Sequence, residues 1–328
     1  MAAAGQQQQN VVEVLDRDSG SDSAYTDDDY RSYASTLTSS VENYQWIGGR
    51  RFHAYREGTY NFPNDEEEQD RLDLFHGIFT LRIDGKLHLA PVKEPSRILD
   101  IGTGTGIWAI EAADKYENAQ VYANDLSPIQ PKWVPPNLTF EVDDVESDWP
   151  PRPPFDLIHS RYMAGSIADW PRLMQQAYTQ TSNGGWAEFQ DLDLHNYSED
   201  NSIPAGNKVL ELYKHIIQGC EQVGRTACPG PNLKRWMEEA GFRNVTEHIL
   251  KLPLGPWPRD MTLRRIGAAN LTQMLDGLDA FSVALFTKVL GWKVEEVQLF
   301  LREVREDAKR KSVHMIHHFH VVYGQRVD

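Results

Sequence analysis

A run of three alternating glycines, set directly after an apolar segment, constrains the fold of this chain more than any other feature. The stretch RILDIGTGTGI contains Gly102, Gly104 and Gly106. Glycine adopts backbone conformations that other residues avoid, and it lets another group approach the main chain closely. The apolar residues of 96–101 predict a buried strand, and residues 106–116 predict a helix. The loop therefore joins a strand to a helix, and we expect a ligand to contact its backbone.

Strand and helix patterns alternate along much of the chain. Strands are predicted over residues 96–101, 119–125, 137–144, 155–161, 182–194, 244–255 and 314–326. Helices are predicted over residues 106–116, 170–181, 205–224, 231–242 and most of 259–311. Such alternation favours a parallel sheet with helices on both faces. The sequence thus predicts an α/β fold with a doubly wound, Rossmann-like, seven-stranded and mostly parallel sheet, which binds its ligand at the carboxyl ends of the strands.

The composition changes along the chain and indicates three regions. Residues 1–40 are rich in Gln, Ser, Thr and Asp and poor in large apolar side chains, which predicts a disordered acidic and polar tail. Residues 41–95 are expected to form an N-terminal helical lid. Residues 96–328 are expected to form the sheet domain, with helical insertions at about 200–240 and 256–312.

The negative net charge of the chain argues against nucleic acid as a partner. Its 328 residues carry a formal net charge of −15, whereas a nucleic-acid-binding chain usually shows a basic footprint. No apolar run reaches the roughly 18 residues that a transmembrane helix needs, and the N-terminus lacks the pattern of a signal peptide. We expect a cytoplasmic protein, or alternatively a nuclear one, that binds neither a membrane nor nucleic acid.

The sequence does not predict a metal site. Cys220 and Cys228 are too few for a disulfide framework, and their spacing fits no zinc signature. Near the C-terminus, His318 and His320 share one face of the last predicted strand, while His317 faces the other way. We expect two reduced thiols, a strand of mixed exposure and no bound metal.

The residues around the glycines favour a ligand with a positive group over a phosphate. A P-loop needs a Lys after its glycines, and a dinucleotide site has G-x-G-x-x-G spacing; this loop has no such Lys and reads G-x-G-x-G. Asp100 lies two residues before Gly102, where a carboxylate favours an amino group or a sulfonium rather than an anion. Asp125 ends the second strand and can accept hydrogen bonds from ribose hydroxyls, in this kind of site or in an NAD site.

The pattern of two apolar residues, Asp, an apolar residue and G-x-G-x-G resembles the first motif of class I S-adenosylmethionine-dependent methyltransferases. The resemblance implies that the backbone at Gly102 and Gly104 approaches the methionine part of the cofactor. It also implies that Asp100 orients the amino end of the cofactor, directly or through water.

The same resemblance implies contacts to the nucleoside half of the cofactor. In that family an acid at the end of the third strand reads the adenine amino group, which implies Asp144, or Asp143 if the register slips by one. The backbone amide of Val145 then reads a ring nitrogen, and Leu126 packs on the adenine or ribose. The residues expected to bind S-adenosylmethionine are Asp100, Gly102, Thr103, Gly104, Gly106, Asp125, Leu126, Asp144, Val145 and Ser160.

Longer stretches are similar to the fungal LaeA-like methyltransferase family. They include NDLSPIQPKWVPPN within residues 124–149, RRFHAYREGTYNFPNDEEEQDRLDLFH at 50–76, HSRYMAGSIADWPRL at 159–173 and GGWAEFQDLD at 184–193. That family includes regulators of secondary metabolism and enzymes that methylate small molecules or peptides. The resemblance therefore specifies the cofactor better than the methyl acceptor.

Methyl transfer from a sulfonium is an in-line displacement, so the protein mainly has to align the acceptor and keep water out. A hydroxyl acceptor would also benefit from a base. His159, Arg161 and Tyr162 end or follow the fourth strand, where the transferred methyl is expected, and are the candidate catalytic residues. The segments expected to form the acceptor pocket are 44–60, 205–224 and 259–311, with apolar walls from Trp46, Phe52, Trp186, Trp257 and Trp292 if these face it.

Three functions follow from these observations. The first is a methyltransferase that moves a methyl group from S-adenosylmethionine to an O or N atom of a fungal secondary metabolite, a small molecule or a modified peptide. The second is a LaeA-like regulatory or protein methyltransferase that acts with a protein partner in a nuclear complex. The third is a non-methylating relative that keeps the fold.

Overall fold

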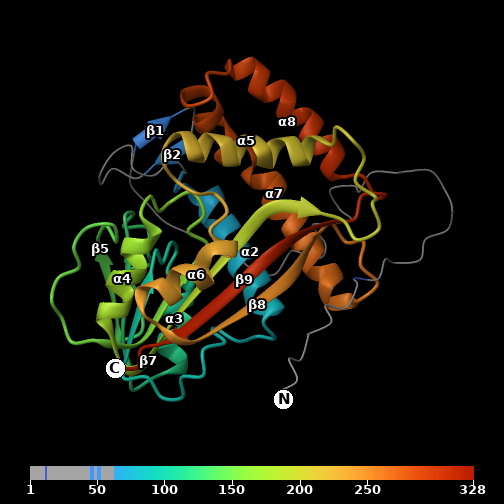
Figure 1. Ribbon diagram of the computed structural model, residues 1–328. Coiled ribbons are helices and arrows are strands. Elements are labelled where there is room, and N and C mark those ends of the chain that lie inside the picture. Colours follow the sequence, from blue (N-terminus) through green and yellow to red (C-terminus); the bar gives the residue numbers. More distant parts are fainter. Residues whose placement is uncertain (1–11, 13–44, 48–49, 53–62) are drawn as a thin grey trace.

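The computed structural model describes residues 12, 45–47, 50–52 and 63–328 (Figure 1). The predicted tail over residues 1–40 lies outside the described residues, apart from Val12. Val12 is buried, and its backbone N–H donates to Glu199 Oε2 at 2.7 Å. Among the described residues, no helix combines the length and the apolar character needed to cross a membrane.

The described part of the chain contains both helices and strands in alternation. The helices are α2 (Glu66–Arg82), α3 (Ile107–Lys115), α4 (Trp170–Gln180), α5 (Lys208–Gln222), α6 (Gly230–Ala240), α7 (Met261–Lys288) and α8 (Val294–Ala308). The strands are β1 (Gln45–Ile47), β2 (Arg50–Phe52), β3 (Arg97–Ile101), β4 (Gln120–Asp125), β5 (Leu138–Val142), β6 (Phe155–Arg161), β7 (Thr181–Tyr197), β8 (Arg243–Leu254) and β9 (Met315–Gln325). All seven strands predicted for the main sheet are confirmed.

The main sheet has seven strands in the order β5-β4-β3-β6-β7-β9-β8. Strands β5, β4, β3, β6 and β7 are parallel, and β9 pairs antiparallel with both of its neighbours. The chain enters at β3, builds outwards to β5 and then returns to place β6 on the other side of β3. The order of strands therefore reverses between β3 and β6, which is where open α/β sheets bind their ligands. The predicted mostly parallel, doubly wound sheet is confirmed.

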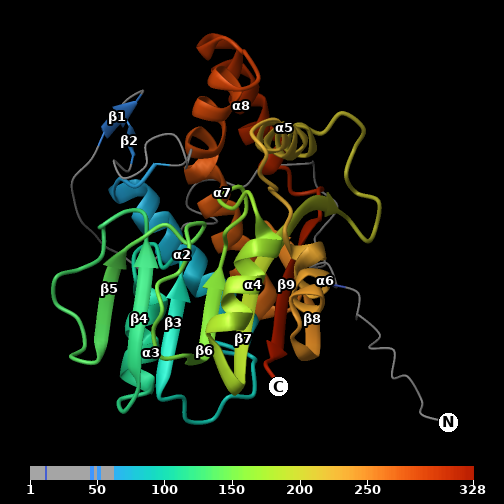
Figure 2. The same ribbon diagram turned by 60° about the vertical axis from the view of Figure 1, so that its left-hand side comes forward.

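Helices cover both faces of the sheet and one end of it (Figure 2). Helix α3 packs its alanines and Trp108 on one face, against β3, β4 and β6. Helices α4 and α6 cover the opposite face. Helices α2, α5, α7 and α8 form a third apolar cluster with the ends of β7, β8 and β9. Figure 2 shows α5, α7 and α8 beyond the arrowheads of the parallel strands, so this helical layer lies next to the ligand-binding edge.

Helix α2 precedes the sheet and begins with a side-chain cap. The Asp65 side chain accepts a hydrogen bond from the backbone N–H of Glu68 at 3.1 Å, and acidic residues fill the first turn. Both features stabilise the positive end of the helix. In the described part of residues 41–95, this helix is accompanied by the short hairpin β1–β2. The helix was predicted from the sequence and the hairpin was not.

Candidate active site

A cavity, whose empty space counted together with open solvent is about 1100 Å³, lies at the carboxyl ends of β3, β4, β5 and β6, against α2 and the start of α3. Most of the residues expected to bind the cofactor line it. They are Asp100, Gly102, Thr103, Gly104, Asp125, Leu126, Asp144 and Val145. The three candidate catalytic residues, His159, Arg161 and Tyr162, line it as well. The structure thus brings together groups from four strand ends that are far apart in the sequence.

The glycine loop turns through backbone conformations that favour glycine. Gly102 and Gly104 have φ angles of 65° and 58°. A side chain at Gly102 would collide with the sulfur of Met163, whereas one at Gly104 would meet, among the described residues, only Leu72 at 3.7 Å. The Gly104 N–H donates to Asp125 Oδ2 at 2.9 Å, which fixes the loop against the end of β4. The main chain at Gly104 is therefore open to close approach from the cavity.

Two residues expected to contact the cofactor lie outside the cavity lining. Gly106 begins α3 with a φ of 83°, and a Cβ there would collide with the ring of Phe140. The Ser160 hydroxyl is buried and donates to the carbonyl oxygen of Ile101 at 3.2 Å. In the structure these residues serve the packing of the loop and the joining of β6 to β3, and their contact with the cofactor stays a prediction.

Acidic groups from the next two strand ends face the same cavity. The second oxygen of Asp125 accepts the backbone N–H of Ser127 at 2.9 Å, so this carboxylate bridges two loops. Strand β5 ends at Val142, and Asp143 and Asp144 both follow it and both line the cavity. Asp144 Oδ1 accepts the N–H of Glu146 at 2.9 Å. The choice between Asp143 and Asp144 for the adenine contact stays open.

Asp100 forms a buried pair with His159. The imidazole Nδ1 lies 2.7 Å from Asp100 Oδ1, and the Thr103 hydroxyl donates to Asp100 Oδ2 at 2.6 Å. The indole of Trp108 stacks on the imidazole with ring centroids 3.7 Å apart and an interplanar angle of 2°. Burial raises the pKa of Asp100 to about 7 and lowers the pKa of His159 well below its usual value. The pair therefore joins two strand ends with a neutral imidazole.

Arg161 and Tyr162 follow the Asp100–His159 pair at the end of β6. Arg161 donates from Nε to Gln190 Oε1 at 2.7 Å and from Nη2 to the carbonyl oxygen of Leu87 at 3.2 Å, so its side chain is held by the protein itself. Burial lowers the pKa of Arg161 to about 10, a value at which the side chain keeps its charge at neutral pH. Tyr162 has a positive φ of 60°, and its ring packs edge-on against Phe75 with centroids 4.5 Å apart.

Comparison with known proteins now identifies the family. Residues 58–247, more than half of the chain, match a family described as methyltransferase domain. The chain belongs to this methyltransferase family. The methyltransferase is 46% identical over 300 residues to the methyltransferase pytC of Aspergillus terreus, covering 91% of this chain and 93% of the relative.

Other relatives carry a regulatory name. This methyltransferase is 36% identical to the secondary metabolism regulator LAE1 of Cochliobolus heterostrophus, over 85% of this chain and 93% of the relative. It is also 36% identical to the secondary metabolism regulator laeA of Aspergillus fumigatus, over 85% of this chain and 75% of the relative. A solved structure of Haemonchus contortus phosphoethanolamine N-methyltransferase 2 aligns with a TM-score of 0.45 and 16% identity, over 79% of this chain and 57% of that one.

The cofactor of this methyltransferase is S-adenosylmethionine, and the cavity fits it in two respects. The backbone at Gly104 is open toward the described part of the chain, in which only Leu72 lies within 4 Å of a Cβ placed there. The carboxylates of Asp100, Asp125, Asp143 and Asp144 make the strand edge acidic, which suits a ligand with an ammonium and a sulfonium group.

Several residues that line the cavity were not among the predicted site residues. Leu72, Phe75, His76 and Phe79 of α2 form one wall, and Met163, Ser166, Ile167 and Arg225 form another part. The helical spacing of the α2 residues was visible in the sequence. No sequence signal places Met163 or Arg225 beside the glycine loop. The described tryptophans expected as acceptor walls, Trp186, Trp257 and Trp292, line neither this cavity nor the second one described below.

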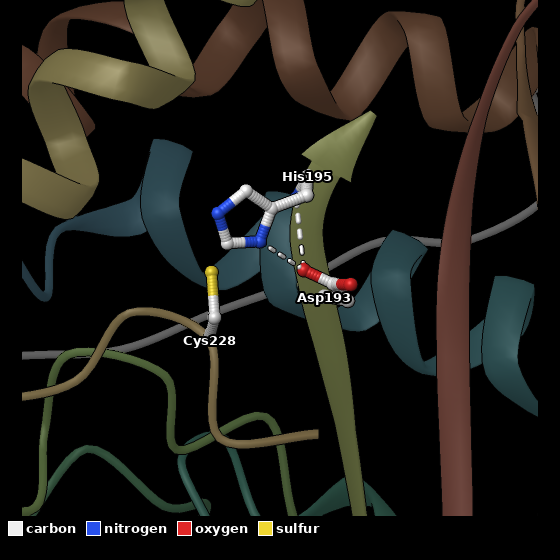
Figure 3. Close-up of side chains that lie close together, drawn as sticks. All are labelled: Asp193, His195 and Cys228. Atoms are coloured by element: carbon white, nitrogen blue, oxygen red, sulfur yellow. Dashed lines mark hydrogen bonds and ion pairs between the residues drawn. The ribbon is translucent and has the colours of Figure 1, made fainter. Parts of the chain in front are cut away.

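A separate cluster lies at the end of β7 (Figure 3). Asp193, His195 and Cys228 place ligand-type atoms within 4.8 Å of one another, the one such group of three in the part of the chain that the structure describes. Asp193 Oδ1 accepts both the backbone N–H of His195 at 2.9 Å and its Nδ1 at 2.7 Å. Burial raises the pKa of the Cys228 thiol to about 12, so the thiol stays protonated at neutral pH. The two hydrogen bonds of Asp193 to His195 fasten the end of β7.

Proposed function

We propose that this methyltransferase transfers a methyl group to an O or N atom of a small molecule of fungal secondary metabolism. The observation that carries the proposal is the composition of the active-site cavity. Its acidic edge is formed by the strand ends, and the facing wall consists of Phe75, Phe79 and Tyr162. An apolar wall beside the cofactor groups favours a small apolar acceptor. The similarity to pytC, which is named a methyltransferase, supports the same choice.

The residues that would hold the cofactor divide between its two halves. The backbone at Gly102, Thr103 and Gly104 would contact the methionine half. Asp100, which accepts a hydrogen bond from the Thr103 hydroxyl, would stabilise the ammonium group. Asp125 would accept hydrogen bonds from the ribose. When bound, S-adenosylmethionine supplies a methyl group on a sulfonium, which is already activated for displacement.

Asp144 or Asp143, together with Leu126 and Val145, would hold the adenine. Each of these residues lines the cavity beyond the ends of β4 and β5. A carboxylate such as that of Asp144 accepts hydrogen bonds, and an exocyclic amino group donates them.

The three candidate catalytic residues have different roles in this proposal. His159 Nε2 is buried without a hydrogen-bond partner among the described residues, and its Nδ1 is engaged by Asp100. Arg161 is engaged by Gln190 and Leu87. We therefore assign His159 and Arg161 to positioning the strand ends, and Tyr162 to contact with the acceptor. Alignment of the acceptor and exclusion of water supply the rate enhancement.

Mass spectrometry tests this proposal directly. The purified chain, S-adenosylmethionine and a panel of phenols, aliphatic alcohols and amines would be incubated, and the products examined for added methyl groups. The proposal expects methylation of at least one class and formation of S-adenosylhomocysteine in equal amount. Binding of the cofactor with no turnover on any class would contradict it.

A regulatory role is the second candidate, because LAE1 and laeA are named regulators of secondary metabolism. Deletion of residues 1–40 distinguishes a small-molecule enzyme from a regulator. A small-molecule enzyme should keep its turnover after deletion, whereas a regulator that acts in a nuclear complex should lose partner binding or nuclear location. For the small-molecule enzyme we propose a cytoplasmic location.

A further inference from the structure

A second cavity lies beyond Tyr162, and its empty space, counted together with open solvent at its mouth, is about 530 Å³. It shares Phe75 and Tyr162 with the cofactor cavity, so these two side chains separate the two spaces. Its other walls come from the strands β7 and β9 of the main sheet, from the helices α5 and α7, and from Ala164 and Ala227 between elements.

The lining of this second cavity is mainly apolar and has no charged side chain among the described residues. The apolar side chains are Phe75, Leu192, Leu194, Ile216 and Phe281, with Ala164, Cys220 and Ala227 between them. The polar side chains are Tyr162, Tyr213, Asn270, Gln273 and His317. A ligand with a net charge would find no counter-ion on these walls, and burying an unpaired charge is costly.

Two of the polar groups are held in fixed positions by a buried chain of hydrogen bonds. Arg71 Nη1 donates to Gln273 Oε1 at 2.9 Å, and Gln273 Nε2 donates to Asn270 Oδ1 at 2.8 Å. Asn270 Nδ2 donates to the carbonyl oxygen of Pro253 at 2.9 Å. The charge of Arg71 is balanced by Glu68, whose Oε2 lies 2.9 Å from Arg71 Nε. The side chains of Asn270 and Gln273 are therefore held in fixed orientations in the cavity wall.

His317 differs from these groups. It is 2% exposed and lies on the face of β9 that carries Met315 and Phe319 into the helical layer. Its ring meets Tyr213 edge-on with centroids 5.1 Å apart. Within the described residues its imidazole has no hydrogen-bond partner, although it lines the cavity. Buried polar groups are nearly always hydrogen-bonded, so an unpartnered imidazole facing a cavity points to a ligand.

The protonation state of His317 defines what it can bind. Burial lowers the pKa of His317 to about 4. The ring is therefore neutral at pH 7 and presents one N–H donor and one lone pair. Either nitrogen can pair with an uncharged polar group such as a hydroxyl.

We propose that this second cavity binds the methyl acceptor, an uncharged and mainly apolar molecule, such as a substituted aromatic ring, that places a hydroxyl group on His317. This inference rests on the proposed function, because it identifies the class of acceptor. Tyr162 and Phe75 at the boundary place the acceptor next to the cofactor groups. The left-handed backbone at Tyr162 holds that ring in the boundary, where a strained residue serves a functional contact.

The test compares two probes that differ by one hydroxyl. Binding of 2-naphthol and of naphthalene to the full chain would be measured from the fluorescence of each probe. The wild-type protein should bind 2-naphthol at least about tenfold more tightly than naphthalene, the effect of one good hydrogen bond. His317→Phe should remove that preference and leave naphthalene affinity within about twofold. A preference that survives His317→Phe, or that is absent in the wild-type protein, would overturn the proposal.

A second variant tests the cavity without touching His317. Ile216→Phe adds volume to the cavity wall and should lower the affinity for both probes by about tenfold or more. Ile249→Phe makes the same change at a partly exposed position on β8 and should leave both affinities unchanged. Equal binding of both probes by Ile216→Phe and the wild-type protein would place the probes elsewhere and overturn the proposal.

Titration with S-adenosylmethionine distinguishes a failure of the proposed acceptor cavity from a failure of the proposed function. A variant that binds the cofactor as the wild-type protein does is folded, so its loss of probe binding counts for the acceptor cavity. If neither probe binds while S-adenosylmethionine does, the acceptor inference fails and the proposed function stands. If S-adenosylmethionine fails to bind the wild-type protein, the proposed function fails, and the probe comparison still decides whether the cavity takes a hydroxyl-bearing ring.

Discussion

Asp100 and His159 are register partners on the adjacent parallel strands β3 and β6, with 2.7 Å between Asp100 Oδ1 and His159 Nδ1. Side chains of paired residues in a parallel ladder point to the same face, so the two groups meet because of the sheet register. The pair links β3 to β6, the two strands between which the strand order reverses. The glycine loop follows β3, and Tyr162, the residue proposed to contact the acceptor, follows β6. The Asp100–His159 pair therefore fixes the position of the loop relative to Tyr162.

Replacing His159 should destabilise both the fold and the cofactor site. His159→Ala leaves the buried carboxyl of Asp100 with one partner fewer and removes the ring on which Trp108 stacks. We expect the free energy of unfolding to fall by about 1–3 kcal/mol, with weaker binding of S-adenosylmethionine. Denaturant unfolding and calorimetry measure the two effects.

His195 provides a matched control, because it also places Nδ1 2.7 Å from an aspartate, yet its side chain is 69% exposed. His195→Ala should change the free energy of unfolding by less than about 1 kcal/mol, since exposed ion pairs contribute little. Equal losses in His159→Ala and His195→Ala would show that burial of the Asp100–His159 pair is unimportant.

Gly102 should tolerate no side chain. Gly102→Ala combines a left-handed backbone with a collision against Met163, so it should cost about 1–3 kcal/mol of stability beyond the backbone strain and reduce cofactor binding. Gly184 has a φ of 84°, and no described residue lies within 4 Å of the position that a Cβ would take, so Gly184→Ala is expected to carry the backbone strain alone. The comparison requires thermal unfolding and cofactor titration of both variants. Unchanged cofactor binding by Gly102→Ala would contradict the contact proposed between the cofactor and the backbone at Gly102.

The stability of the protein should depend on pH through His317. Its pKa is about 4 in the folded state, below the ordinary value of 6.5. Between these values the unfolded chain binds more protons, so the wild-type protein loses stability as the pH falls from about 6.5 to about 4. His317→Phe lacks this loss. The difference in unfolding free energy between wild type and variant should therefore shift by about 1–3 kcal/mol in favour of the variant over that range. A constant difference from pH 7 to pH 4 would show that His317 titrates normally.

The sequence was sufficient to predict the order and type of the main elements and half of the site. Strong local signals explain this success. The glycines of the first loop, the apolar run before them and Asp125 at the next strand end depend only on neighbours in the chain. The third strand was predicted two residues too long at its end, at 144 rather than Val142, and for that reason Asp143 and Asp144 could not be told apart.

The remaining site residues depend on contacts between distant segments. The pairing of Asp100 with His159 requires the β3–β6 register, and the placing of Met163 against Gly102 requires the loop after β6. His317 was assigned to the correct face of its strand, but nothing local shows that this face lines a cavity. Trp257 and Trp292 were considered as acceptor walls and instead pack in apolar clusters with Ile316 and with Phe286.

The most direct test of the central claim is a calorimetric titration of the full chain with S-adenosylmethionine, made in parallel on wild type, Asp125→Ala and Asp148→Ala. Asp148 is fully exposed at the surface and serves as the matched control. We predict that the wild-type protein binds one equivalent, that Asp125→Ala binds more weakly by about 1–3 kcal/mol, and that Asp148→Ala equals the wild type. Equal affinity of Asp125→Ala and the wild type, or no binding to the wild-type protein, would contradict the account of this cavity as the cofactor site.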